Sequence, residues 1–221
     1  MYPTLEVRWF IRGSIPEEVR EWFVRGDPAP VDAPPRVDYY LFLQRSNALG
    51  IKLREGRIEI KQRLHQYGNI HFHRRVTGVI EHWCKWSLPL AATHDGWAGM
   101  LVPRSSWIAV RKERMLRGYR CDADGQVVAT PGGYADRGCH MELTGVQAGD
   151  RVWWTLAFEA YGAEPSLRSS LASTMGYILE SDGAPCSLDG RDSYGYARWL
   201  ALLEQGAYAQ DNRRKNMPWH Q

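Results

Sequence analysis

The chain has 221 residues, enough for one sizeable domain, and its 28 Lys and Arg against 25 Asp and Glu give a net charge of +3. Domains that bind nucleic acids usually have a larger excess of basic residues, so we expect no specific nucleic-acid binding. No apolar run approaches the ~20 residues of a membrane-spanning helix, so we expect no membrane partner. Residues 1–13 do not resemble a signal peptide, because charged residues interrupt the apolar run that one requires. The four cysteines form no C-x-x-C pair, which favours reduced thiols in a cytoplasmic protein. A disulfide between Cys121 and Cys139 stays open.

The first predicted elements are a strand, a short helix and a loop. Alternating side chains predict a strand over residues 5–11. The next segment predicts a helix that has Ser14 as its N-cap and ends by Gly26. The proline-rich stretch 26–36 predicts an extended loop within the domain.

The middle of the chain consists mainly of strand patterns. A hairpin is predicted with its turn near Glu55 and Gly56, because a glycine between two β-type runs is typical of such turns. Together with the first strand, these patterns give seven or eight strands. They cover residues 37–44, 50–53, 58–63, 78–88, 107–119, 139–146 and 152–162, with a turn at 147–150 joining the last two.

The last third of the chain changes to helical periodicity. Helices are predicted over residues 165–181 and 193–205, and a polar tail follows. We therefore predict one domain over residues 1–208 and a polar tail over 209–221. Many alternating strands with terminal helices predict an α+β fold, either an antiparallel sheet or a barrel with helices packed outside.

Charged residues recur two positions apart in several predicted strands. Side chains at this spacing share one face of a strand, so each strand would have a charged face and an apolar face. A barrel closed with the charged faces inward would suit a polyanion, whereas the solvated face of an open sheet would give the same pattern. The charges fall at Lys52 and Arg54, at Glu59, Lys61 and Arg63, and at Lys112 and Arg114.

In their order along the chain, these motifs resemble those of the CYTH superfamily, also called triphosphate tunnel metalloenzymes. The resemblance spans residues 5–203 and begins at Glu6, where the family has an E-x-E-x-K strand. The basic pairs named above match the family's basic strands. Glu81 stands in a middle acidic strand, Glu142 and Glu159 stand in late acidic strands, and Ser193-Tyr194 followed by Trp199-Leu200 resembles the C-terminal helix.

The resemblance implies an eight-stranded antiparallel β-tunnel with flanking helices, notably at the C-terminus. In the family, basic residues inside the tunnel grip a triphosphate and carboxylates hold Mg²⁺ or Mn²⁺. Members hydrolyse inorganic triphosphate or thiamine triphosphate, or cyclise ATP, reactions that need charge neutralisation and positioning. The implied ligand-binding residues are Lys52, Arg54, Lys61, Arg63, Lys112 and Arg114, to which Arg8 would add a cation, and the implied metal ligands are Glu6, Glu59, Glu81, Glu142 and Glu159.

The sequence departs from the family pattern where carboxylates are expected. Arg8 and Phe10 replace the second carboxylate and the lysine of the first motif, and Ala157 stands two residues before Glu159, where another carboxylate is expected. These changes favour triphosphate or polyphosphate binding over hydrolysis. A divalent-metal-dependent phosphohydrolase with weakened catalysis stays open, as does a non-catalytic binding or interaction protein that has lost the metal site. A binder of a lipophilic ligand is a weaker alternative.

The glutamates also have an interpretation that needs no metal. A barrel interior of mixed charge has to neutralise itself, so these carboxylates can instead form ion pairs with the neighbouring cations. The sequence leaves both possibilities open.

Overall fold

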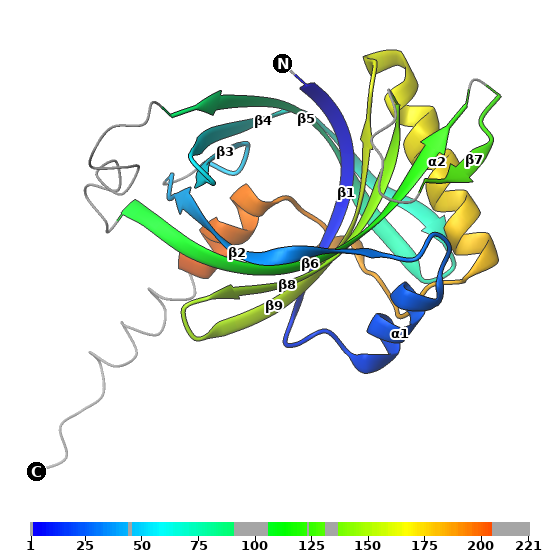
Figure 1. The fold of residues 1–221 in the computed structure, drawn as a ribbon, viewed down its shortest axis with the longest axis horizontal. Helices are drawn as coiled ribbons and strands as arrows, with labels where there is room; N and C mark the ends of the chain where they lie inside the picture. The colour runs from blue at the N-terminus through cyan, green and yellow to red at the C-terminus, as the bar shows by residue number, and fades with distance from the viewer. Residues whose placement is uncertain (1, 44–45, 91–105, 123, 131–136, 205–221) are drawn as a thin grey trace, which may run out of the picture.

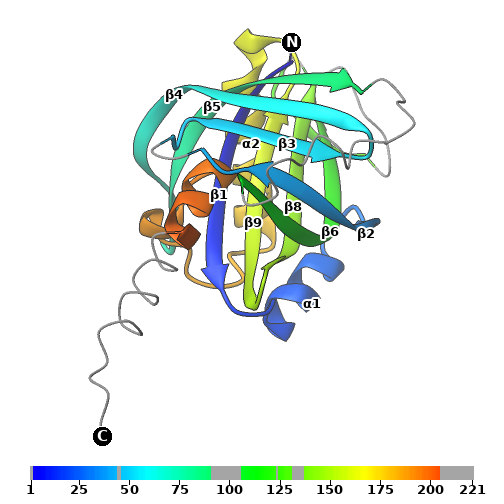
Figure 2. The same cartoon turned by 90° about the vertical axis from the view of Figure 1, so that its left-hand side faces the viewer.

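The computed structural model describes residues 2–43, 46–90, 106–122, 124–130 and 137–204, and shows an α+β fold built around one strongly curved sheet (Figures 1 and 2). A helical segment over residues 196–204 ends the described part of the chain. The preceding elements are β1 (Tyr2–Arg12), α1 (Glu17–Arg25), β2 (Val31–Leu41), β3 (Leu49–Arg54), β4 (Arg57–His73), β5 (Val76–Pro89), β6 (Trp107–Cys121), β7 (Val127–Ala129), β8 (Gly138–Ala148), β9 (Arg151–Tyr161), α2 (Glu164–Ser181) and the 3₁₀ turn η3 (Gly190–Asp192).

Eight strands of the described chain close into a barrel. Hydrogen-bonded neighbours follow the order β2-β3-β4-β5-β1-β9-β8-β6, and β6 pairs with β2 to complete the ring. The short strand β7 pairs with the far end of β6, beyond the part of β6 that pairs with β2. Neighbouring strands run antiparallel. The predicted antiparallel eight-stranded barrel with flanking helices is therefore confirmed.

The outer face of the barrel carries one hydrophobic core, which α2 covers. Val7 and Trp9 of β1 are fully buried on this face and pack with Leu171, Met175 and Ile178 of the helix. Complete burial of each such side chain contributes about 1.5–3 kcal/mol. The same core includes Val19, Trp22 and Phe23 of α1 and Met141, Leu143, Leu156 and Phe158 of β8 and β9.

A second hydrophobic core fills one half of the barrel interior. Phe10, Tyr40 and Val110 of the barrel strands pack against Trp199 and Leu200 of the 196–204 segment. The rings of Phe10 and Trp199 stack with their centroids 5.2 Å apart. Figure 1 shows this segment, in orange, within the ring of strands. The 196–204 segment thus closes the aromatic part of the barrel, and charged side chains line the remaining part.

Strand β2 begins earlier than the sequence predicts. Residues 26–36 are expected to form a loop, but β2 already starts at Val31 and pairs with β6 from there onward. The prediction is wrong because Pro34 and Pro35 lie at a shift of register, where the missing N–H donors are tolerated, and β3 pairs with the later part of β2.

Two further details differ from the sequence prediction and one agrees with it. Helix α1 begins at Glu17 with Pro16 at its N-cap position, so Ser14 is not its N-cap. Strand β7 was not predicted, because three residues are too few to show an alternating pattern. The turn at Glu55 and Gly56 is confirmed, with φ angles of 47° and 72°. The predicted tail boundary at residue 209 lies outside the described residues.

The cysteines and the helices bear on two other predictions. Cys84, Cys121, Cys139 and Cys186 are all free thiols, so the disulfide that the sequence left open is not formed. Burial raises the pKa of the Cys139 thiol, and Cys121 Sγ lies 3.3 Å from Thr174 Oγ1. Among the helices that the structure describes, none has both the length and the apolar character required to cross a membrane.

Candidate functional site

The charged half of the barrel interior encloses a cavity of about 160 Å³. Barrel strands supply most of its walls, and Gly195, Tyr196 and Ala197 close one side. Among the lining residues that the structure describes, cations outnumber carboxylates by eight to four. The cations are Arg8, Arg36, Lys52, Arg54, Lys61, Lys85, Lys112 and Arg114, and the carboxylates are Glu6, Glu59, Glu142 and Glu159.

The two-residue period of the strands brings these charges together. Lys112 and Arg114 lie on the inward face of β6 and line the cavity. Arg111, just before Lys112, and Glu113, between the two, are exposed on the outer face. Lys52 and Arg54 follow the same rule in β3. Two of the three predicted basic pairs, Lys52 with Arg54 and Lys112 with Arg114, therefore converge on the cavity as their spacing predicts.

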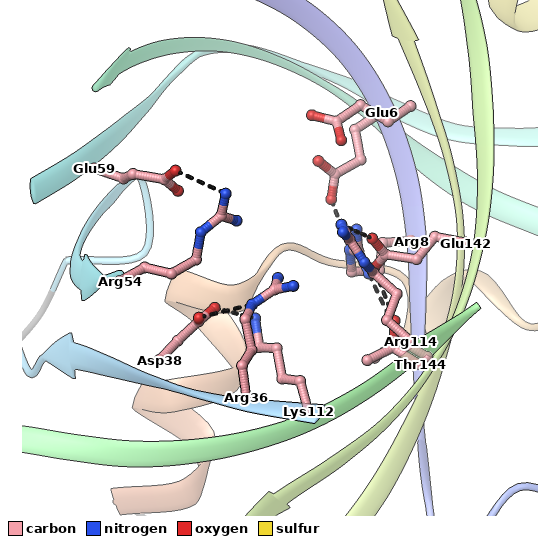
Figure 3. Close-up of polar contacts among 12 residues, drawn as sticks. Glu6, Arg8, Arg36, Asp38, Arg54, Glu59, Lys112, Arg114, Glu142 and Thr144 are labelled. Atoms are coloured by element: carbon pink, nitrogen blue, oxygen red, sulfur yellow. Dashed lines mark hydrogen bonds and ion pairs between the residues drawn. The ribbon is translucent and has the colours of Figure 1, made fainter. Parts of the chain in front are cut away.

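The charged residues form two networks that face each other across the cavity (Figure 3). With all groups ionised, and counting described residues, the first has five cations to two carboxylates and the second has three to three. The first, called here the Asp38–Glu59 network, contains Arg36, Asp38, Lys52, Arg54, Glu59, Lys85 and Lys112. The second, called here the Glu6–Glu142 network, contains Glu6, Arg8, Lys61, Arg114, Glu142 and Glu159.

Arg8 is the centre of the Glu6–Glu142 network and is only 5% exposed. Its Nε donates to Glu6 Oε1 at 2.8 Å, and its Nη1 donates to Glu142 Oε1 at 2.7 Å and to Thr155 Oγ1 at 3.0 Å. Ala157 of β9 is the register partner both of Arg8 in β1 and of Glu142 in β8. Arg8 therefore reaches Glu142 across a residue that has no more than a methyl group.

Lys61 and Arg114 complete this network. Lys61 Nζ pairs with Glu6 Oε2 and, at 3.1 Å, with Glu159 Oε1, while Arg114 Nη1 donates to Glu142 Oε2 at 3.3 Å. Burial favours the neutral form of Glu142, but the two guanidinium groups outweigh it and hold the pKa of this carboxyl well below its usual range. Lys61 in the same way overcomes burial and lowers the pKa of Glu159 to about 2.

Asp38 anchors the facing network from behind the cavity wall and is 0% exposed. Its Oδ1 accepts from Arg36 Nε at 3.0 Å, its Oδ2 accepts from Lys52 Nζ at 3.3 Å, and Lys112 Nζ lies 3.1 Å from Oδ2. Burial alone would raise the pKa of Asp38, but these three cations hold it well below its usual range. One carboxylate thus neutralises only part of the charge around it.

Glu59 has a similar set of partners and, unlike Asp38, lines the cavity. Lys52 Nζ lies 3.0 Å from Oε2, and Arg54 Nη2 and Lys85 Nζ lie 3.3 Å and 3.4 Å from Oε1. These cations outweigh burial and lower the pKa of Glu59 to about 2. Glu55 also lies 3.7 Å from Arg54 Nε, but this carboxylate is 67% exposed and water screens the pair.

Burial raises the pKa of a carboxyl group but lowers the pKa of a lysine. It lowers the pKa of Lys112 well below its usual range, with the nearby charge of Lys52 as the next cause. Lys112 Nζ donates to Tyr40 Oη at 2.6 Å and lies 3.7 Å from the centroid of the Tyr196 ring. If Lys112 is neutral, the described part of the network still has an excess of two positive charges.

Several polar atoms at the cavity are buried and lack a hydrogen-bond partner within the described part of the chain. They are Arg54 Nε, Arg114 Nε and Tyr196 Oη. Leaving a buried polar group unsatisfied costs about 1–3 kcal/mol. All three can donate, so a ligand rich in acceptor oxygens would remove this cost.

Most of the residues implied by the resemblance lie at the cavity, and two do not. Arg63 and Glu81 are absent from the described lining and pair with each other, and Glu81 also accepts from Trp83 Nε1 at 3.3 Å. Burial raises the pKa of Glu81. The residues that do line the cavity are Arg8, Lys52, Arg54, Lys61, Lys112, Arg114, Glu6, Glu59, Glu142 and Glu159.

Sequence reasoning missed five residues of the site: Arg36, Asp38, Tyr40, Lys85 and Tyr196. The first three alternate along β2 and share its inward face, a signal that was present but partly hidden in the segment taken for a loop. Lys85 shares a face of β5 with Glu81 and could have been included on that ground. Tyr196 has no local signal, because it reaches the cavity through the packing of the C-terminal segment.

The glutamates do not fit a divalent cation such as Mg²⁺ or Mn²⁺. In the described parts of the chain, no three Asp, Glu, His or Cys side chains gather in a group able to hold one. Both oxygens of Glu6, of Glu142 and of Glu59 already face cationic nitrogens. Mg²⁺ requires oxygen ligands of its own, and the nearby guanidinium groups would repel it. The geometry therefore agrees with the alternative that these carboxylates form ion pairs.

Comparisons with known proteins do not assign a family. No family model matches the chain, and no curated protein matches it. Among solved structures, the chain is similar to the PH1819 protein from Pyrococcus horikoshii OT3, at 14% sequence identity and a TM-score of 0.41, over 91% of this chain and 99% of that one. A likeness this distant carries no argument about function, which has to be inferred from the cavity.

Proposed function

We propose that the cavity binds a phosphate-rich anion, a triphosphate or a polyphosphate, in a CYTH-like barrel. The observation that carries this proposal is the positive excess of the Asp38–Glu59 network, which remains after its carboxylates are paired. Phosphate oxygens are negatively charged and only accept hydrogen bonds, so they complement a wall of Arg and Lys donors. A lipophilic ligand would leave these charges buried without compensation.

Arg54 and Arg36 are the residues that we expect to bind the phosphates most directly. Arg54 uses Nη2 on Glu59, and Arg36 uses Nε on Asp38. A guanidinium group carries more N–H donors than these contacts use. Arg54 Nε in addition lacks a hydrogen-bond partner among the described residues. Both arginines line the cavity and can bind an anion while they keep their carboxylate partners.

Binding without efficient hydrolysis agrees best with the state of the carboxylates. Metal-dependent phosphoryl transfer requires carboxylates that are free to hold the cation, whereas those of the Glu6–Glu142 network are engaged by Arg8, Lys61 and Arg114. We therefore propose a non-catalytic phosphate-binding protein, with at most slow phosphohydrolase activity. Four free thiols support a reducing compartment such as the cytoplasm.

Thermal unfolding in the presence of different phosphates tests the proposal. A ligand that binds only the folded state stabilises it by about 2.7 kcal/mol at one hundred times its Kd. We expect tripolyphosphate to raise the Tm more than orthophosphate does, and added NaCl to weaken the effect because the attraction is ionic. The absence of a shift with tripolyphosphate, ATP and longer polyphosphate at low salt would contradict the proposal.

A pair of matched arginine variants locates the binding site. Arg54→Gln should weaken tripolyphosphate binding about tenfold or more, which corresponds to about 1.4 kcal/mol. Arg111→Gln makes the same change of charge on the outer face of β6, where the side chain is 58% exposed, and should change the affinity less than about twofold. Equal losses in both variants would indicate nonspecific attraction to net charge.

A further inference from the structure

We infer that Arg8 takes the place of a divalent cation in this cavity, so that the phosphate ligand binds as a metal-free anion. The identity of the ligand rests on the function proposed above, whereas the role of Arg8 rests on the geometry of the Glu6–Glu142 network alone. The guanidinium group lies between Glu6 and Glu142, with one nitrogen within 2.8 Å of each carboxylate (Figure 3).

The bonding of the two carboxylates leaves a metal ion no oxygen of its own. Glu6 presents Oε1 to Arg8 and Oε2 to Lys61. Glu142 presents Oε1 to Arg8 and Thr144 and Oε2 to Arg114. A divalent cation would have to displace Arg8, which is 5% exposed and would then be a buried charge without partners.

The charge of this network leads to the same inference. Three cations face three carboxylates among its described members. A carboxylate at position 8, as the E-x-E pattern would have, changes the ratio to two cations and four carboxylates. The resulting excess of two negative charges is what one divalent cation neutralises. Arg8 brings the same network to neutrality with a side chain.

The second departure from the pattern lies directly beside the first. Ala157 is opposite Arg8 in one strand pair and opposite Glu142 in the next, and it is 0% exposed. A longer side chain at this position would stand between the guanidinium and Glu142. Arg8 and Ala157 thus act as one structural unit, in which the alanine provides the space that the arginine needs to reach Glu142.

This arrangement has a consequence for binding. The ligand needs no bridging metal, because the Asp38–Glu59 network supplies positive charge on the opposite wall. Magnesium in solution instead competes with the protein for the phosphate oxygens. We therefore expect added Mg²⁺ to weaken the apparent affinity for tripolyphosphate.

Calorimetric titration with Mn²⁺ in the absence of phosphate tests the role of Arg8 independently of the ligand. The unmodified protein should show no stoichiometric Mn²⁺ binding up to about 1 mM, which reaches the dissociation constants of weak carboxylate sites for divalent cations. Arg8→Glu should acquire a Mn²⁺ site at least about tenfold tighter than any in the unmodified protein. Arg8→Gln, which removes the cation without adding a carboxylate, is the matched control and should bind Mn²⁺ more weakly than Arg8→Glu.

Titration with tripolyphosphate in EDTA completes the test and needs no variant that could fail to fold. Binding in EDTA, weakened by Mg²⁺, supports the inference. Binding that disappears in EDTA and returns with Mn²⁺ would overturn the inference and leave the proposed function standing. If tripolyphosphate does not bind under either condition, the proposed function fails, and the Mn²⁺ titrations alone decide the role of Arg8. Stoichiometric Mn²⁺ binding by the unmodified protein would overturn that role.

Discussion

The two networks that face each other across the cavity are both built from carboxylates, lysines and arginines but differ in charge. In the Glu6–Glu142 network, the described cations and carboxylates are equal in number and the buried arginine contacts two carboxylates. In the Asp38–Glu59 network, two carboxylates are shared among five described cations. We infer from this difference that the number of Lys and Arg residues alone does not mark a ligand-binding wall. Under the proposed function, the mark of that wall is the excess of cations over the carboxylates that pair with them.

Acid should weaken both networks and should lower the stability of the protein more than any change below. The pKa values of Glu59 and Glu159 are lowered to about 2, and those of Asp38 and Glu142 are also lowered, so the stability that these groups contribute is present above about pH 4–5. This stability should be lost as the pH falls toward 2. The free energy of unfolding should fall by about 5 kcal/mol in total, because one such carboxylate contributes about 2.6 kcal/mol when it is fully shielded.

Urea unfolding between pH 6 and pH 2.5 measures this loss. Glu159 is 31% exposed, which reduces its share through solvent screening. Glu81 acts in the opposite direction, because its raised pKa means that the folded state favours its protonated form. A free energy of unfolding that stays constant over this range would contradict the assignment of buried, ionised carboxylates.

Replacing Asp38 should have the next largest effect. Asp38→Asn leaves Arg36, Lys52 and Lys112 around a neutral amide, and removing one partner of a buried charge cluster costs about 3–5 kcal/mol. Urea denaturation gives this value directly. Glu113→Gln is the control, because it removes a carboxylate from a pair on the outer face that is 60% exposed and worth about 0–1 kcal/mol. Similar costs in both variants would contradict the central position of Asp38.

A larger side chain at position 157 tests the Glu6–Glu142 network separately. Ala157→Leu should push the guanidinium of Arg8 away from Glu142 and cost about 1–3 kcal/mol, as overpacking of a buried site does. Ala109→Leu places the same side chain at an exposed position of β6 and should stay within about 0.5 kcal/mol. If Ala157→Leu is equally mild, the space above Ala157 is not needed by Arg8.

The smallest effect should come from the hairpin turn that joins β3 and β4 beside the Asp38–Glu59 network. Gly56 has a φ of 72° and open space where a Cβ would be, so Gly56→Ala should cost about 1 kcal/mol through backbone strain alone. Tripolyphosphate affinity should be unchanged in this variant. Glu55→Asn, at the other positive-φ position, should be neutral or slightly stabilising. A large loss of affinity in Gly56→Ala would show that the turn itself contacts the ligand.

The sequence predicts the direction of the cavity side chains better than it predicts their partners. The i, i+2 spacing places Lys52 with Arg54 and Lys112 with Arg114 on inward faces because that relation is local to one strand. The pairing of Arg8 with Glu142 depends on β1, β9 and β8 being neighbours in a fixed register, which is a property of the closed barrel.

Two residues show other limits of the sequence analysis. Asp38 lies in the predicted strand 37–44, but Arg36, two residues before it on the same face, lies in the proline-rich stretch that was predicted as a loop, so the charge pattern of this strand was not seen. Prolines are tolerated there because β2 shifts its register against β6. Tyr196 was missed because the 196–204 segment enters the barrel through aromatic packing on Phe10 and Tyr40, which no short-range pattern encodes. The helix itself was predicted; its place inside the ring was not.

Calorimetric titration of tripolyphosphate in EDTA at low salt, into the unmodified protein and into the Arg36→Gln/Arg54→Gln double variant, decides whether the Asp38–Glu59 network binds the phosphate. The double variant leaves Lys52 and Lys112 on Asp38 and leaves Lys52 and Lys85 on Glu59, so the carboxylates keep cationic partners and the fold should be retained. We expect one-to-one binding to the unmodified protein and a loss of about a hundredfold or more in the variant, about 2.8 kcal/mol. Equal affinity in both proteins, or no binding to either, would contradict the assignment of the Asp38–Glu59 network as a metal-free phosphate site.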